Sequence, residues 1–115
     1  MKEEFNFRDI TSFEVACNHL GKPIPSFDGL SLKEINLLKL SRVIEVINNG
    51  WKPDFRDRNQ NKWYPYFITD SDDVGTYDYT YYSLFIMALP LALYLESQEK
   101  AEYMGKTFTD LYNEL

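Results

Sequence analysis

Apolar residues recur at helical spacing along two stretches near the start of the chain. The first stretch follows Thr11, with Glu14 three positions later, and it ends at Gly21. The second follows Ser31, with Glu34 three positions later, and it is apolar on more than one face. A Ser or Thr followed three residues later by Glu is the capping-box pattern of a helix start, and Gly commonly ends a helix. The pattern therefore predicts two helices, of which the second is the central one.

Two further helix boundaries follow from the same signals. Gly50 stands where a left-handed residue ends the central helix, and Trp51 is then expected to fold back onto Val46, on the core side. The last helix is expected to start at Ser97, with Gln98 and Glu99 favouring its positive end. Its apolar stripe has the spacing of one helical face and continues to the end of the chain, with Ala101, Met104, Phe108, Leu111 and Leu115.

Beyond Pro53 the spacing changes from helical to strand-like. Residues 63–69 predict a short aromatic strand, and Pro65 favours an edge position for it. Residues 76–88 are rich in Tyr, Thr, Phe and Ile and predict a second strand. Residues 91–95 alternate in the manner of a third strand.

Residues 82–95 also admit a second interpretation, as one helix kinked at Pro90. Strands are preferred because the run opens with Tyr-Asp-Tyr-Thr-Tyr-Tyr, which is a poor helix start. The expected fold is therefore a single α+β domain over residues 1–115. It has two N-terminal helices, a small three-stranded antiparallel sheet and a C-terminal helix, and residues 1–9 are expected to be loose.

Composition narrows the class of protein. The chain carries a net charge of −6, which argues against binding to duplex nucleic acid or to anionic membranes. Cys17 is the single cysteine, so no internal disulfide can form and a reducing compartment is expected. The N-terminus lacks the apolar stretch of a signal peptide, and the longest apolar run, Leu84–Leu95, is too short to span a membrane. An intracellular protein is the expectation.

No sequence motif indicates catalysis or metal binding. Cys17 and His19 lie two positions apart on one predicted helix, so the two side chains do not face each other. The acidic turn at 70–78 resembles the start of a calcium loop, but Val74 and Tyr81 stand at positions that require ligands. We therefore expect no enzyme activity, no cofactor and no metal site.

Aromatic and polar residues concentrate between Asn48 and Phe67. Aromatics make up 17% of the chain, more than a small core needs, so some rings are expected at a surface. In one interpretation they form a recognition surface; in the other they cover the sheet while the amides fix a loop. The candidate binding residues are Phe55, Arg56, Arg58, Gln60, Lys62, Trp63, Tyr64 and Tyr66, together with the alternating Tyr77, Tyr79 and Tyr81.

The segment Asn48-Asn-Gly-Trp-Lys-Pro-Asp-Phe, followed by Asn59-Gln-Asn-Lys-Trp-Tyr-Pro-Tyr-Phe, resembles a family of small acidic proteins. The family is associated with phages and mobile elements of gut Bacteroidetes, and the likeness runs from about Ser12 onward. Phe55 and Tyr66 depart from it, because Trp is usual at both places. The family has no established activity, so the resemblance implies a phage or mobile-element accessory protein and carries over no functional residue.

Together these observations lead to one expected function and one alternative. The expected function is a non-enzymatic interaction module that binds a protein partner through the aromatic-polar surface. The alternative is binding of single-stranded nucleic acid or carbohydrate by aromatic stacking. The expected location is the bacterial cytoplasm, with association with a virion as the other possibility.

Overall fold

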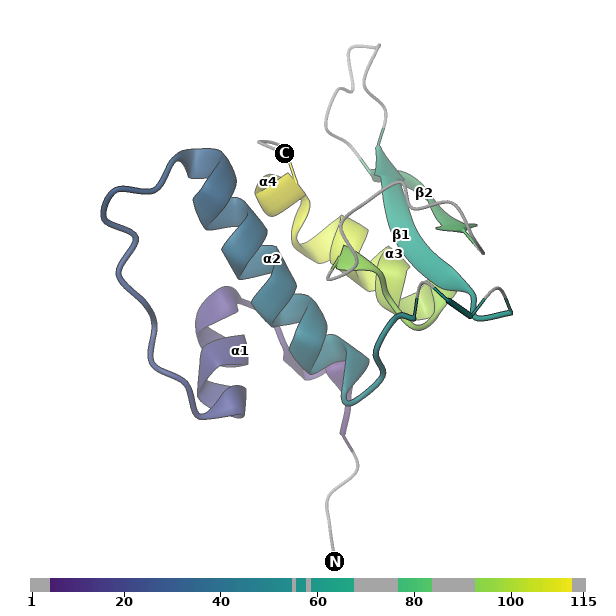
Figure 1. The fold of residues 1–115 in the computed structure, drawn as a ribbon, viewed down its shortest axis with the longest axis horizontal. Coiled ribbons are helices and arrows are strands. Elements are labelled where there is room, and N and C mark those ends of the chain that lie inside the picture. Colours follow the sequence, from purple (N-terminus) through teal and green to yellow (C-terminus); the bar gives the residue numbers. More distant parts are fainter. Residues whose placement is uncertain (1–4, 55, 58, 68–76, 84–92, 113–115) are drawn as a thin grey trace, which may run out of the picture.

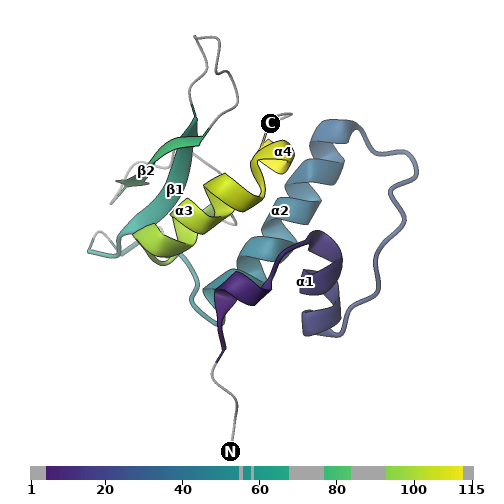
Figure 2. The same cartoon turned by 180° about the vertical axis from the view of Figure 1, so that it is seen from behind.

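The computed structural model describes residues 5–54, 56–57, 59–67, 77–83 and 93–112. Helix α2 is the centre of the arrangement, with α1 on one side of it and α3 on the other (Figure 1). Seen from behind, α3 lies between α2 and the two strands (Figure 2). The elements in chain order are η1 Phe7–Asp9, α1 Phe13–Leu20, α2 Leu32–Asn48, β1 Lys62–Phe67, β2 Tyr77–Ser83, α3 Gln98–Thr107 and α4 Thr109–Tyr112.

Local signals set the helix starts, with one shift from the prediction. The predicted capping box of α2 is confirmed: Ser31 Oγ accepts from the Glu34 N–H at 3.2 Å, and Glu34 Oε1 accepts from the Ser31 N–H at 3.0 Å. For α1 the N-cap is Ser12, which accepts from the Val15 N–H, and not Thr11. Glu14 is therefore the second residue of the helix, whereas a capping box requires Glu at the third residue.

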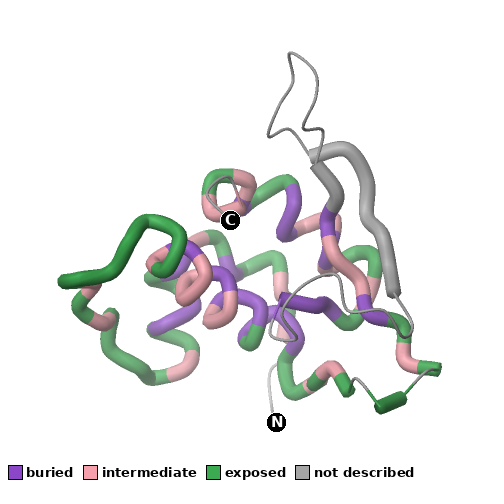
Figure 3. Tube along the Cα trace, turned by 45° about the horizontal axis from the view of Figure 1, so that its top comes forward, coloured by how far each residue is buried: buried purple, intermediate pink, exposed green. Residues whose placement is uncertain are grey.

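The chain between α1 and α2 runs the full length of α2, so the two helices point in the same direction (Figure 1). Gly21 ends α1 with a φ of 69°, a left-handed conformation that favours glycine. Most residues of this connection are exposed, in contrast to the buried positions along the facing sides of the helices (Figure 3). The N-terminal segment, expected to be loose, contains the short helix η1, and Phe7 packs edge-on against Tyr103 of α3.

The described core is formed by the inner faces of the helices and by the segment before α3. As predicted for the central helix, α2 contributes the most buried residues, and α3 contributes Ala101 and Met104. The last helix is predicted as one element but is interrupted after Thr107, and a short helix α4 follows. Thr109 Oγ1 donates to the Gly105 carbonyl at 2.6 Å across this break.

The described strands form a two-stranded antiparallel sheet, and the predicted three-stranded sheet is wrong for this part of the chain. Of the third strand, residues 91 and 92 lie outside the described residues, and Leu95 pairs with Trp63 as an isolated bridge. The kinked-helix alternative is also wrong at its start, because Tyr82 lies in β2. Residues 68, 69 and 84–88 of the predicted strands lie outside the described residues.

Two residues of the sequence explain why the third segment stops at one bridge. The Trp63 N–H and C=O both hydrogen-bond to Leu95. Trp63 therefore directs its backbone groups to the edge of β1 that faces away from β2. The next position of β1 on that side is Pro65, which has no N–H to donate to a longer ladder. In the other direction, Ser97 already caps α3 by accepting from the Lys100 N–H at 3.2 Å.

A buried asparagine joins the helical part to the strand part. Asn48, the last residue of α2, is 4% exposed. Its Nδ2 donates to the Tyr94 carbonyl at 3.0 Å, and its Oδ1 accepts from the Glu96 N–H at 3.0 Å. Because Leu95 between these two residues pairs with Trp63, the Asn48 amide fixes the end of α2 relative to β1.

Candidate functional site

The loop between α2 and β1, residues 49–61, is held together by its own polar groups. Asp54 Oδ1 accepts from the Arg56 N–H at 2.9 Å, and Asp57 Oδ1 accepts from the Asn59 N–H at 2.9 Å. Side chains that bond their own backbone two residues later form Asx turns, which fix a local chain direction. We call the described residues of 51–60 the recognition loop, after the binding role that the sequence analysis nominates for this stretch.

Gln60 ties the two sides of the recognition loop together. Its Oε1 accepts from the Asp54 N–H at 2.7 Å, and its Nε2 donates to the Lys52 carbonyl at 3.0 Å. Both ends of the amide are thus bonded to backbone within the loop. The sequence nominated Gln60 as a binding residue, and in the structure its amide fixes the loop.

Lys62 is the least expected member of this region. It was nominated as a cation for binding, but it is 2% exposed at the start of β1. Its Nζ donates to the carbonyls of Asp57 and Gln60, each at 3.2 Å. The ammonium therefore lies inside the turn that the loop makes before β1.

The two tryptophans, one at each end of the recognition loop, have different surroundings. Trp63 is half-buried and packs against the hydrophobic core. Trp51 is also half-buried, but it is not among the described part-buried rings that pack against that core. The expectation that Trp51 folds onto the core side is therefore wrong.

The backbone after α2 explains the position of Trp51. Asn49 adopts the left-handed conformation with a φ of 46°, and Gly50 follows with a φ of 99°. The helix therefore ends one residue before the predicted left-handed Gly50. At a helix end of this kind, the residue after the left-handed one folds its side chain back onto the helix. Here that residue is Gly50, which has no side chain, and Trp51 lies one position beyond it.

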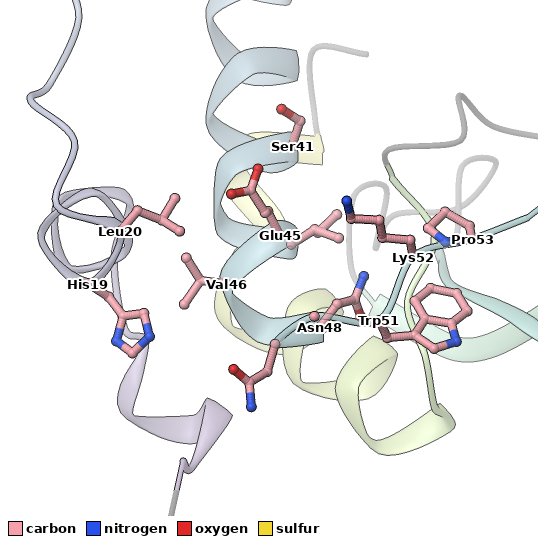
Figure 4. A pocket seen from close by; sticks show the side chains of 12 residues that line it. His19, Leu20, Ser41, Glu45, Val46, Asn48, Trp51, Lys52 and Pro53 are labelled. Atoms are coloured by element: carbon pink, nitrogen blue, oxygen red, sulfur yellow. The ribbon is translucent and has the colours of Figure 1, made fainter. Parts of the chain in front are cut away.

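Trp51 forms one wall of an open groove of about 490 Å³ that crosses the outer side of α2. The opposite wall comes from the end of α1, and the floor comes from nearly sealed residues such as Val46, which is 2% exposed. Glu45 in this groove lies 3.9 Å from Lys22, and both side chains are exposed. Figure 4 shows the labelled lining residues: His19, Leu20, Ser41, Glu45, Val46, Asn48, Trp51, Lys52 and Pro53.

This groove was missed by the sequence reasoning, apart from Trp51 itself. Three of its polar members, His19, Glu45 and Lys52, come from separate segments that only the fold brings together. The one local signal was the pair Asn49-Gly50, because both residue types adopt left-handed conformations readily. Two such residues in sequence turn the following side chain away from the helix.

The structure describes only some of the remaining candidate binding residues of this region. Arg56 is exposed in the recognition loop. Tyr64 is half-buried, and its ring meets the buried Tyr94 ring edge-on at 5.8 Å. Phe55 and Arg58 lie outside the described residues, as does the side chain of Tyr66, which belongs to β1.

The nominated tyrosines of β2 are described by backbone only. The register pairs Tyr81 with Tyr64 and Tyr79 with Tyr66. Directly paired positions share one face of an antiparallel ribbon, so these four positions lie on the same face. The register shifts between Tyr66 and Phe67, which interrupts the predicted regular alternation from Tyr77 to Tyr79.

The other candidate chemistry of the chain has structural surroundings. Cys17 is buried, and the Arg42 guanidinium lies 3.5 Å from its sulfur. His19 is exposed, with its ring against that of Phe5. Residues 70–76 of the acidic turn lie outside the described residues. Within the described residues, no group of three or more His, Cys, Asp or Glu side chains could hold a metal ion.

Among the described residues, the groups with a shifted pKa lie away from the loop and the groove. Hydrogen bonds from the Ser31 backbone and hydroxyl lower the pKa of Glu34 at the start of α2. Burial raises the pKa of Tyr103, whose hydroxyl donates to the Ile10 carbonyl at 2.7 Å. Burial also raises the pKa of Tyr112. These shifts therefore report on helix capping and packing.

Comparison of the chain with protein-family models, with curated proteins and with solved structures gives no match. In the described part of the chain, no helix has both the length and the apolar character needed to cross a membrane.

Proposed function

We propose that this chain is a non-enzymatic interaction module that binds a protein partner through the recognition loop and the neighbouring Trp51 groove. One observation carries the proposal: the loop is fixed from within, by Gln60 and Lys62, while its outer residues are exposed. A loop that is already ordered loses less conformational entropy when it binds.

The chemistry of the surface supports a protein partner. The recognition loop begins with the half-buried Trp51 and exposes Lys52, Asp54, Arg56 and Asn59. Interfaces are enriched in Trp, Tyr and Arg, and polar loop residues supply adaptable hydrogen bonds around such anchors. The net charge of −6 disfavours a polyanionic partner, so a protein is preferred over nucleic acid.

The resemblance to proteins of phages and mobile elements supplies the biological setting of the proposal. In that setting the chain is an accessory protein that acts in the bacterial cytoplasm or travels with the virion. Its partner is then a protein of the host or of the element.

The test compares capture of one identified partner by matched variants. The tagged protein first captures a partner from lysate of a Bacteroidetes host, and the partner is then purified. Trp51→Ala and Arg56→Ala should each weaken its binding at least tenfold, as expected for interface anchors. Leu32→Ala and Lys33→Ala are the matched controls, because both residues are exposed at the start of α2, and they should bind as the wild type does.

Two outcomes would overturn the proposal. Unchanged binding by Trp51→Ala and Arg56→Ala would remove this surface from the interaction. Quenching of tryptophan fluorescence by single-stranded oligonucleotides or by glycans, lost in Trp51→Ala, would show that the surface binds a stacked ligand instead. Weakening of the quench by salt would distinguish a nucleic acid from a sugar.

A further inference from the structure

A buried ammonium lies inside the recognition loop. Lys62 is 2% exposed, and it belongs to β1, which follows the loop. Burying an ammonium is costly unless polar groups replace the lost water. The groups that do so here should therefore be sensitive to the charge on Lys62.

Those groups are carbonyl oxygens of the loop itself. Nζ donates to the carbonyls of Asp57 and Gln60 at 3.2 Å each. The Asp57 carbonyl also accepts from the Gln60 N–H at 3.3 Å, so both carbonyls belong to one turn. None of the ion pairs found among the described residues includes Lys62.

Two carboxylates of the same loop accept hydrogen bonds from backbone N–H groups. Asp54 and Asp57 both accept in Asx turns, at 2.9 Å each. In a calcium loop, carboxylates and backbone carbonyls ligate the cation and so order the loop around it; here two backbone carbonyls hold the cation, while the carboxylates order the backbone through Asx turns. In this loop the cation is a side chain of the protein.

We propose that the Lys62 ammonium is the internal cation that orders the recognition loop, in the role that a bound metal ion has in other loops. Lys62 is thus a positioning residue for the binding surface, and the importance of that surface rests on the proposed function. The loop should keep its order without any divalent ion. It should lose that order when the charge is removed, even where the aliphatic part of the side chain is retained.

The test is amide hydrogen exchange by NMR on the full chain without partner. Lys62→Met keeps a side chain of similar length without the charge. Exchange at the hydrogen-bonded loop amides should become at least tenfold faster, while amides in the middle of α2 keep their wild-type rates. The loop amides to follow are those of Asp54, Arg56, Asp57, Asn59 and Gln60. A chelator should leave the wild-type rates unchanged.

A second variant separates the charge from the packing. Lys62→Ala lacks a propylammonium group relative to the wild type. Added propylammonium should restore slow exchange in the loop, whereas n-propanol and sodium chloride at the same concentration should not. Recovery with n-propanol would show that aliphatic packing holds the loop, and would overturn the proposal.

Two other results would also overturn it. Loop amides that keep wild-type rates in Lys62→Met would show that the charge is not needed. Equal acceleration in the loop and in α2 would show that Lys62 supports the whole fold and not the loop. Because these measurements need no partner, they stand apart from the proposed function. If the loop loosened with no loss of partner binding, the loop would be ruled out as the binding surface, and the role of Lys62 in ordering it would stand.

Discussion

Trp51 and Trp63 stand at opposite ends of one loop and differ in what surrounds them. Trp63 is held by a backbone bridge to Leu95, and its ring packs against the core. Trp51 follows two left-handed residues that carry it past the end of α2, where it lines an open groove. The same residue type in the same segment therefore has different surroundings, set by the left-handed residues before Trp51 and by the bridge to Leu95 at Trp63.

The contrast between the two tryptophans extends the candidate binding surface toward Trp51. The sequence nominated the stretch from Phe55 to Tyr66 for recognition, and a core position for Trp51. In the structure the exposed polar side chains lie between the two tryptophans, with Trp51 as the ring outside the core packing. Mutations that affect stability and mutations that affect binding should therefore separate along a short stretch of sequence.

The largest effect on stability is expected at Trp63. Trp63→Ala removes a ring that packs against the core, and should lower the free energy of unfolding by about 3 kcal/mol. Urea denaturation followed by far-UV circular dichroism measures it. A midpoint equal to that of the wild type would show that Trp63 is not part of the core, and the contrast with Trp51 would disappear.

The next effect is expected at Asn48, which joins α2 to the segment paired with Trp63. Asn48→Ala leaves the Tyr94 carbonyl and the Glu96 N–H without this partner, and should cost about 2 kcal/mol. Asn18→Ala, at an exposed position of α1, is the control and should show no loss in the same urea experiment. Similar results for both variants would argue against the Asn48 connection.

A smaller effect is expected where α3 begins, beside the strand pair. Ser97→Ala removes the side chain that caps the Lys100 N–H, and should cost about 1 kcal/mol. Thermal unfolding of this variant and of Ser97→Asp makes the measurement, since Asp also caps helices well. Failure of Ser97→Asp to keep near-wild-type stability would indicate that Ser97 acts in another way.

Of the two tryptophans, Trp51 is expected to contribute less to the free energy of unfolding. Trp51→Ala should change the free energy of unfolding by about 0.5 kcal/mol, since the ring lies outside the core packing. Urea denaturation alongside Trp63→Ala gives the direct comparison. A loss as large as that of Trp63→Ala would place Trp51 in the core and remove it from the proposed surface.

A pH-dependent effect is expected far from both tryptophans, at the start of α2. Hydrogen bonds from Ser31 hold the pKa of Glu34 below its ordinary value of 4.5. The stabilisation is therefore complete above that value and is lost as the pH falls through the lower folded-state pKa. The urea midpoint should fall less on acidification in Glu34→Gln than in the wild type. An equal dependence of the midpoint on pH in both proteins would contradict the role assigned to Glu34.

The sequence by itself determined the helices that depend on neighbouring residues. The Ser31 and Glu34 box, the Gly21 terminus and the Ser97 cap involve groups a few positions apart, so the chain encodes them locally. The central position of α2 also followed from its pattern, because a helix that is apolar on more than one face must be covered on those faces.

The tertiary structure decided which polar and aromatic residues face inward. Nothing local marks Lys62 as buried, because the carbonyls around it are available only once the loop has folded back. The groove likewise combines α1, α2 and the recognition loop, and its walls meet only through long-range packing. The groove depends on residues distant in sequence. The carbonyls that hold Lys62 are only two and five positions away, but they converge on the ammonium only in the folded loop. The order of residues along the chain could therefore suggest these features but could not assign them.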